Sequence, residues 1–218
     1  MSPIHRKPRP LKRDADSLRD DRLFIVACDD TYAPKQYFDF FKITRVQVHV
    51  VPTEDGTSAA EHVLERLRNI EHEEEDELWM LLDTDHYIQG THLASFTAAL
   101  AAAGQLGVNV ALSRPCFELW LLLHHKEEAE VVPFSSAKEV EKALREELGQ
   151  YNKTKLKQEH FQLESVFNAC SRAERLDATV PGGEIPEGNT SRVYLLWKAI
   201  AAKALPSQLP EELRALIP

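Results

Sequence analysis

Leu81-Leu82-Asp83-Thr84-Asp85-His86 places two carboxylates one residue apart, at the end of an apolar run that begins at Leu78. Such a run predicts a buried β-strand, and ligands of α/β folds bind beyond the carboxyl ends of the strands. Side chains two residues apart in an extended segment point to the same side. Asp83 and Asp85 are therefore placed to offer oxygen ligands to a hard cation such as Mg²⁺. Asp is also common in ordinary strand-to-loop turns, so a purely structural role stays open.

Four apolar runs alternate with helical patterns in the first half of the chain, and the first of them also ends in an acidic pair, Asp29-Asp30. The predicted strands are residues 23–28, 45–51, 78–82 and 108–112. The predicted helices are residues 34–41, 58–70 and 91–104, with Ser58 and Glu61 as a capping box and Gly104 as a stop. The run 45–51 alternates valines with polar residues, which favours a place near an edge. The alternation predicts an α/β fold with a mostly parallel, Rossmann-like sheet flanked by helices.

After Ser113 the pattern becomes mainly helical. Residues 115–125 are strongly apolar but contain Glu118, which needs a partner because an unpaired buried charge is costly. Further helices are predicted at residues 136–149, between a Ser136 and Glu139 cap and Gly149, and at 161–176 and 191–204, with a loop at 179–189. We therefore divide the chain into a basic, flexible arm (1–19), an α/β core (20–125) and a helical extension packed on that core (126–218).

Composition favours a globular protein of the cytoplasm. The chain has 218 residues, 43% of them hydrophobic, which is enough to bury a substantial core. No apolar run reaches the length of a membrane span, and the amino-terminal residues have no signal-peptide core. The three cysteines are widely spaced and odd in number, so they predict neither a disulfide framework nor a zinc ribbon.

The formal net charge of −9 argues against general adhesion to nucleic acid, because binding a polyanion depends on clustered Lys and Arg. Any such contact must be local. The candidates are the amino-terminal arm and the group Lys153, Lys155 and Lys157 beside Tyr151. A frayed tail and a solvated helix face are the alternative interpretations of these two basic segments.

Several acidic-site chemistries fit the pattern poorly. The segment after the first strand, Asp29-Asp30-Thr31-Tyr32-Ala33-Pro34, lacks the glycines of a dinucleotide-binding turn, and the chain has no P-loop. A receiver domain would use Asp83 as phosphoacceptor with Ser113 nearby, but its last strand and lysine are not evident. A haloacid-dehalogenase site would carry the nucleophile on the first strand.

Four segments together resemble the RloB-like family: Ile25-Val26-Ala27-Cys28-Asp29, Tyr37-Phe38, Leu82-Asp83-Thr84-Asp85-His86 and Ser113-Arg114-Pro115-Cys116-Phe117-Glu118-Leu119-Trp120-Leu121-Leu122-Leu123-His124. The last block is the strongest signal. The resemblance is good over residues 20–125 and weaker around residues 151–153 and 189–194. It implies a Toprim-like fold and a nuclease-like core that uses Mg²⁺ or Mn²⁺. It further implies a role in antiphage defence or abortive infection with an ATPase partner of the OLD or AAA type.

The resemblance also implies roles for individual residues. Asp29, Asp83, Asp85 and Glu118 are the expected metal ligands, and Asp29 would also orient or deprotonate the attacking water. Arg114 would steady the charge that develops on the phosphate; alternatively, Arg114 and Glu118 would form a purely structural buried ion pair. From the charge pattern, and not from the resemblance, Lys153, Lys155 and Lys157 are the expected contacts to a DNA or RNA substrate. Whether copies of the chain assemble into an oligomer stays open.

One motif departs from the family pattern. The first motif of the family usually carries a Glu followed by Gly and a further Thr-Glu, whereas this chain has Asp29, Asp30, Ala33 and Pro34 there. A shorter carboxylate is displaced by roughly 1 Å, and such a shift can cost about a hundredfold in rate. Two alternatives to an active nuclease therefore remain: a catalytically weakened binding or sensing module, and a receiver-like phosphoaspartate switch at Asp83.

Overall fold

The computed structural model describes residues 21–30, 32–51, 53, 57–85, 87 and 92–217. The predicted basic arm 1–19 lies outside these residues, as does His86.

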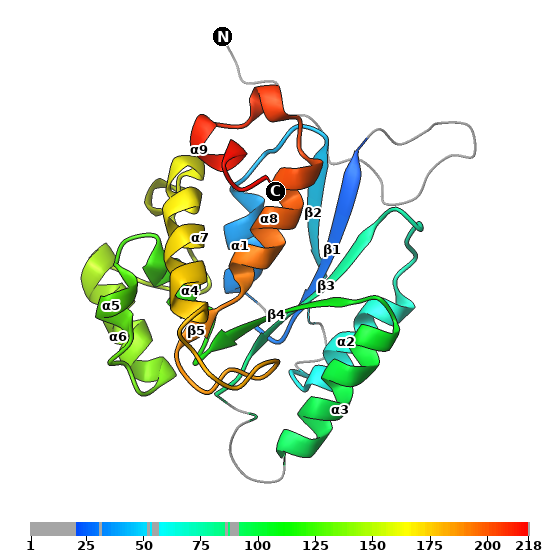
Figure 1. Ribbon diagram of the computed structural model, residues 1–218, viewed down its shortest axis with the longest axis horizontal. Helices are drawn as coiled ribbons and strands as arrows, with labels where there is room; N and C mark the ends of the chain where they lie inside the picture. The colour runs from blue at the N-terminus through cyan, green and yellow to red at the C-terminus, as the bar shows by residue number, and fades with distance from the viewer. Residues whose placement is uncertain are drawn as a thin grey trace.

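The described residues form a five-stranded sheet with the strand order β2-β1-β3-β4-β5 (Figure 1). The strands are β1 (Arg22–Cys28), β2 (Val46–Val51), β3 (Glu77–Asp83), β4 (Asn109–Arg114) and β5 (Thr190–Ser191). The first four are parallel, whereas β5 runs antiparallel to β4. The predicted α/β fold with a mostly parallel sheet is therefore confirmed. The expectation that the second strand lies near an edge is also confirmed, since β2 pairs with β1 on one side only.

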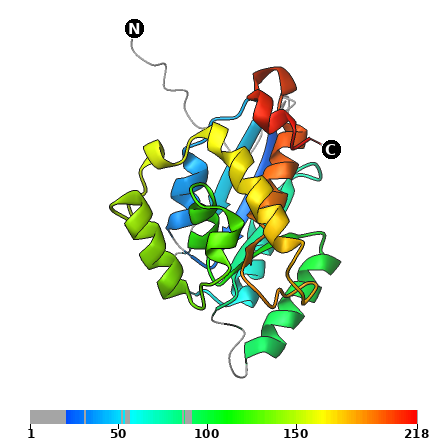
Figure 2. The ribbon, with the colours of Figure 1, turned by 60° about the vertical axis from the view of Figure 1, so that its left-hand side comes forward.

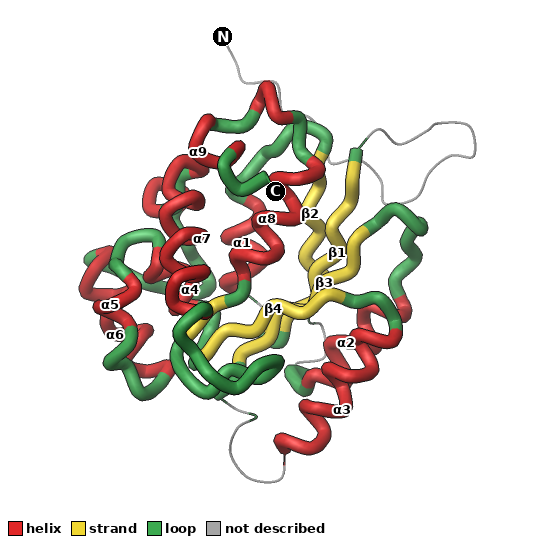
Figure 3. The backbone as a smooth tube through the Cα atoms, in the orientation of Figure 1, coloured by secondary structure: helices red, strands yellow, loops and turns green. Residues whose placement is uncertain are grey.

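Helices cover both faces of the sheet because the central strands are apolar on both sides (Figures 1 and 3). Along β1, Phe24 and Val26 belong to one hydrophobic cluster, and Leu23 and Ile25 belong to the other. The helices α2 (Ala60–Asn69) and α3 (His92–Gln105) pack on the second cluster. The first cluster is covered by α1 (Ala33–Asp39), α4 (Glu118–Leu123), α7 (Leu163–Asp177) and α8 (Val193–Lys203).

The remaining helical segments lie outside this first helical layer. They are α5 (Glu128–Val131), α6 (Ala137–Leu148), α9 (Glu211–Arg214) and the 3₁₀ turns Gln158–His160 and Pro206–Gln208. Figure 2 shows α6 beside α4, which it contacts, on the same side of the molecule as α1. No described helix is both long and apolar enough to cross a membrane.

The local signals that predicted helix ends had mixed success. Ser136 caps α6, since its Oγ accepts a hydrogen bond from the Glu139 N–H at 3.4 Å, and Gly149 ends the same helix with φ of 68°. The predicted capping box of Ser58 is wrong, because α2 begins at Ala60 with Ala59 as its N-cap. The Ser58 carbonyl accepts a hydrogen bond from the Tyr87 hydroxyl.

The predicted stop at Gly104 is also wrong. Gly104 lies inside α3, and the chain turns at Gly107, where φ is 71°. A helix tolerates one glycine at modest cost, whereas a left-handed backbone favours glycine strongly. The second glycine therefore marks the end of the helix better than the first.

Candidate functional site

The strand order creates a crevice at the carboxyl ends of β1 and β3. These strands are neighbours, but the chain leaves β1 for α1 on one face and leaves β3 for α3 on the other. Ligands of open α/β sheets bind at such a point, because the two connections diverge and leave the strand ends uncovered. Asp29 follows β1 and Asp83 ends β3, so the fold brings the two predicted carboxylates to the same place.

Asp29 connects the two strand ends through its side chain. Its Oδ2 accepts a hydrogen bond from the Asp83 backbone N–H at 2.8 Å, and its Oδ1 accepts one from the Asp30 N–H at 2.9 Å. The backbone N–H of Asp29 donates to the Leu81 carbonyl at 3.3 Å. These bonds fix the position and orientation of the Asp29 carboxylate.

A pocket of about 280 Å³ opens at this crevice. Its walls include all four carboxylates that were predicted as metal ligands, namely Asp29, Asp83, Asp85 and Glu118. The walls also include three charged residues that the prediction did not assign to this site, namely Asp30, Glu141 and Lys153. Glu141 comes from the amphipathic helix α6, and nothing in its local sequence distinguishes it from other exposed carboxylates.

The pocket concentrates negative charge in a poorly hydrated place. Burial raises the pKa of Asp29 to about 7, although the backbone N–H groups of Asp83 and Asp30 act in the opposite direction. Burial also raises the pKa of Asp83 well above its ordinary value, and the charges of Asp29, Glu118, Asp30 and Asp85 raise it further. Such mutual repulsion is what a divalent cation would relieve.

The donor set suits a hard cation, because Mg²⁺ and Mn²⁺ prefer carboxylate oxygens. Within the described part of the chain, however, no three His, Cys, Asp or Glu side chains are already arranged as a metal-binding cluster. The four carboxylates share one pocket but would have to turn toward one another to hold an ion. The residues thus fit a divalent cation in chemistry and location, and binding would complete the geometry.

Glu118 obtains its partner from a distant part of the chain. It lies in the first turn of α4 and is only 8% exposed, and its Oε1 accepts a hydrogen bond from the Tyr151 hydroxyl at 2.7 Å. Local sequence gave Arg114 as the candidate partner, but Arg114 Nη1 donates to the Pro186 carbonyl at 2.6 Å. Arg114 is not among the residues that line the acidic pocket. Arg114 ends β4, and its side chain is directed to the loop that precedes β5 and away from the acidic pocket.

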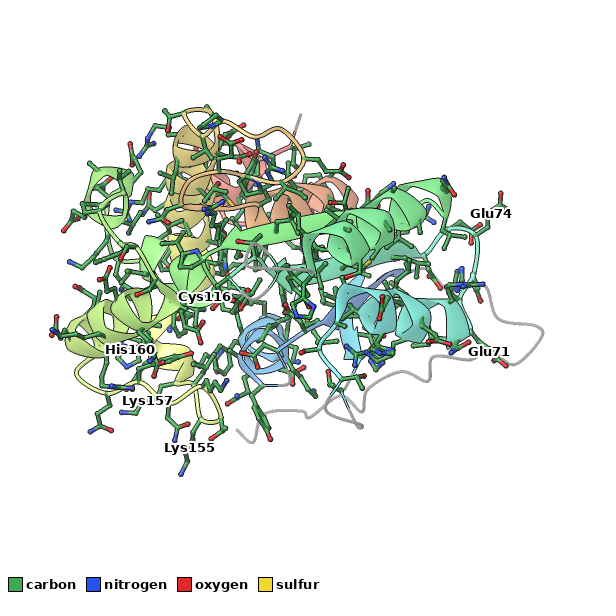
Figure 4. The ribbon with its side chains drawn as sticks, turned by 90° about the horizontal axis from the view of Figure 1, so that it is seen from below. Glu71, Glu74, Cys116, Lys155, Lys157 and His160 are labelled. Carbon is green, nitrogen blue, oxygen red and sulfur yellow. The ribbon has the colours of Figure 1, made fainter. Side chains whose placement is uncertain are left out.

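The three predicted lysines lie on the segment that follows α6. Lys153 lines the acidic pocket, whereas Lys155 and Lys157 line a second pocket of about 370 Å³. Figure 4 shows Lys155 and Lys157 at one end of the molecule and the acidic residues Glu71 and Glu74 at the other. Lys153 therefore lies at the carboxylates, and Lys155 and Lys157 lie far from Glu71 and Glu74.

His124 and the three tryptophans lie in the core. His124 is 5% exposed; its Nε2 lies 3.0 Å from the Tyr37 hydroxyl and its Nδ1 lies 2.8 Å from Ser165 Oγ. Trp79, Trp120 and Trp197 are buried in the hydrophobic cluster on the α1 side of the sheet.

The comparisons with known proteins agree with this arrangement at the level of the family. No curated protein and no solved structure matches the chain significantly. A family model described as RloB-like protein matches residues 24–200, which include the acidic pocket, the lysine segment and all of the sheet except the first two residues of β1. Since this match covers most of the 218 residues, the chain belongs to the RloB-like family.

Proposed function

We propose that this protein is a metal-dependent nuclease-like enzyme that cleaves phosphodiester bonds at the acidic pocket, with Mg²⁺ or Mn²⁺ held by Asp29, Asp83, Asp85 and Glu118. The observation that carries the proposal is the convergence of these four carboxylates, from three separate parts of the chain, on one pocket at the crevice between β1 and β3. Burial raises the pKa of Asp83, and repulsion from the other carboxylates raises it further. A fold retains such a cost most readily where a function requires it.

The residues of the pocket have distinct parts in this proposal. A bound divalent cation would neutralise the phosphodiester and make its phosphorus easier to attack. Asp29 is held by two backbone N–H groups, so it can orient a water molecule and accept its proton as a general base. Lys153, on the wall of the same pocket, can balance the negative charge of the phosphate in the transition state.

The wider biological role is proposed from the family. We infer that the protein acts in the cytoplasm as the effector of an antiphage defence system, together with an ATPase partner. The chain carries a net charge of −9, so contact with DNA or RNA would be restricted to the lysine segment rather than spread over the surface.

A second function, binding without turnover, is favoured by two observations. Asp29 stands where the family usually has the longer Glu, and no described group of side chains is already arranged to hold a metal ion. The protein would then use the same pocket as a docking or sensing element of a defence complex.

One experiment separates the two functions. The wild-type protein, Asp83→Asn and the matched surface control Glu65→Gln, on the exposed side of α2, are incubated with labelled tRNA, single-stranded DNA and plasmid. Each reaction contains Mg²⁺, Mn²⁺ or EDTA, with and without a candidate ATPase. Cleavage that requires metal, is lost in Asp83→Asn and is retained in Glu65→Gln supports the enzyme. Metal binding by calorimetry without cleavage, even with the ATPase, favours the binding module.

A further inference from the structure

The second pocket has a composition that differs from the rest of this acidic protein. It is formed by residues 148–161 and has a volume of about 370 Å³. Its polar lining consists of Gln150, Asn152, Lys155, Lys157 and His160, and its apolar lining consists of Leu148, Tyr151, Leu156 and Phe161. Cations and amides beside an apolar floor form a site for a ligand that has both a negative charge and a flat apolar part.

The walls of this pocket are held in place by other parts of the fold. Gln36 of α1 donates to the Lys153 carbonyl at 2.7 Å and accepts from the Leu156 N–H at 2.9 Å. Asn152 Oδ1 accepts from the backbone N–H of Thr154 at 2.9 Å and closes the turn between them. Phe161 stacks on Phe40 with ring centroids 6.4 Å apart. A ligand would therefore meet a largely formed site and would not have to order the segment.

One polar atom in the wall of the second pocket makes no hydrogen bond within the described fold. His160 Nε2 is shielded from solvent and has no hydrogen-bond partner among the described residues. The nearest acidic oxygen, Glu159 Oε1, lies 3.8 Å away, which is too far for a hydrogen bond. Buried polar atoms normally have partners, so an exception calls for an explanation. A ligand group in the pocket would supply one if the His160 ring, which lines the pocket, turned its Nε2 toward that group.

Tyr151 connects the second pocket to the acidic pocket. It lines the second pocket, and its hydroxyl donates to Glu118 on the wall of the acidic pocket at 2.7 Å. Lys153, two residues further along the same segment, lines the acidic pocket. A chain of phosphates could therefore pass Lys153 and reach Lys155 and Lys157 without leaving the protein surface.

We propose that the second pocket binds one unpaired nucleotide of a single-stranded nucleic acid while a neighbouring phosphate lies at the acidic pocket. This inference rests on the proposed function, whose substrate class it narrows. Lys155 and Lys157 contact the phosphates, and the base enters the pocket beside the apolar floor, where Gln150 and His160 can reach its edge. A duplex keeps its bases stacked and paired, so it cannot fill the pocket unless one base is turned out.

The test measures binding in EDTA with the Asp83→Asn background, so that it does not depend on cleavage. The probes are a labelled sixteen-nucleotide single strand, its duplex with the complementary strand, and a strand of equal length and charge whose central positions are abasic. Fluorescence anisotropy should show the single strand bound at least about tenfold more tightly than either of the others, because base contacts add to the phosphate contacts.

Two variants separate binding of a base in the pocket from binding of phosphates by the positive charge of the lysines. Lys155→Gln with Lys157→Gln should reduce the slope of log affinity against log salt by about 1.4, since each phosphate contact on a single strand contributes about 0.7. The matched control, Lys138→Gln with Lys142→Gln on α6, removes the same charge from residues that line neither pocket and should leave the slope unchanged. Gln150→Trp keeps the charge but fills the pocket, and it should abolish the preference for the intact strand over the abasic one.

Equal affinity for the three probes, or an equal effect of the two double lysine variants, would overturn the pocket proposal. Neither result bears on metal-dependent cleavage. Conversely, absence of cleavage in the assay for the proposed function leaves this binding test fully informative.

Discussion

Among single residues, Asp29 shows most clearly how the fold determines the chemistry available. Its two carboxylate oxygens accept hydrogen bonds from the N–H groups of Asp83 and Asp30 at 2.8 and 2.9 Å. The surrounding backbone therefore fits the length of an Asp side chain, which is shorter than that of Glu. We predict that Asp29→Glu lowers metal-dependent cleavage about a hundredfold, because the carboxylate would move by roughly 1 Å and lose these bonds. Single-turnover kinetics at saturating Mg²⁺ measure the effect. Faster cleavage by Asp29→Glu would instead show that the shorter acid weakens this copy.

The charge of Asp83 gives a second prediction at the residue scale, which concerns stability. The pKa of Asp83 is raised by burial and by the neighbouring carboxylates, so its ionised form destabilises the metal-free fold at neutral pH. Asp83→Asn should therefore be more stable than the wild type in EDTA at pH 7.5, by about 1 kcal/mol, which corresponds to a rise in Tm of about 2 to 4 °C.

Adding Mg²⁺ should reverse the order of stability. The wild type gains stability because the ion binds only the folded state, whereas the variant has lost a ligand and gains little. Differential scanning calorimetry with and without Mg²⁺ measures both effects. A lower Tm for Asp83→Asn in EDTA would contradict the electrostatic interpretation of the pocket.

At the scale of elements, β5 is held by side chains of α7 and α8 as well as by its backbone pairing with β4. Asp177, at the end of α7, accepts hydrogen bonds from Thr190 Oγ1 at 3.1 Å, from Arg192 Nε at 3.0 Å and from the Tyr194 hydroxyl at 3.0 Å. We predict that Asp177→Ala lowers the free energy of unfolding by about 3 kcal/mol, because it leaves a largely buried arginine without its carboxylate. Urea denaturation measures this change. The exposed control Glu146→Ala, which removes a surface pair with Lys142, should change stability by less than about 0.5 kcal/mol.

At the scale of the whole molecule, a buried polar network joins four helices of the same layer. His124, which follows the last residue of α4, bonds to Tyr37 of α1 and to Ser165 of α7, and Trp197 of α8 donates to the Tyr37 hydroxyl at 3.1 Å. Burial lowers the pKa of His124 well below its ordinary value of 6.5, and the charges of His125 and Arg172 act in the same direction.

This network predicts a specific pH dependence of stability. Below pH 6.5 the unfolded chain binds a proton at His124 that the folded protein does not, so stability falls as the pH is lowered. The maximum slope is about 1.4 kcal/mol per pH unit. Asp29 and Asp83, whose pKa values are raised, oppose this trend because their folded forms take up protons first. The pH slope of unfolding should therefore be smaller in His124→Gln than in the wild type, and equal slopes between pH 5 and 6.5 would contradict the prediction.

Predictions from the sequence succeeded where they depended on residues close together along the chain, and failed where they depended on contacts between distant segments. Hydrophobic periodicity depends on neighbours along the chain, so it predicted the four parallel strands and most helices to within a few residues. The capping signal at Ser136 was equally local and was confirmed, whereas that at Ser58 was wrong because α2 begins at Ala60 with Ala59 as its N-cap. The two-residue strand β5 has no periodicity of its own and was not predicted.

The amino-acid sequence by itself determined which segments form the parallel sheet and that acidic side chains stand at the ends of its first and third strands. Only the tertiary structure decided that these strands are neighbours, that Tyr151 and not Arg114 binds Glu118, and that a lysine segment lies beside the acidic pocket. The physical reason is that local patterns reflect the preferences of adjacent residues. Contacts between distant segments depend instead on the free energy of packing the whole chain.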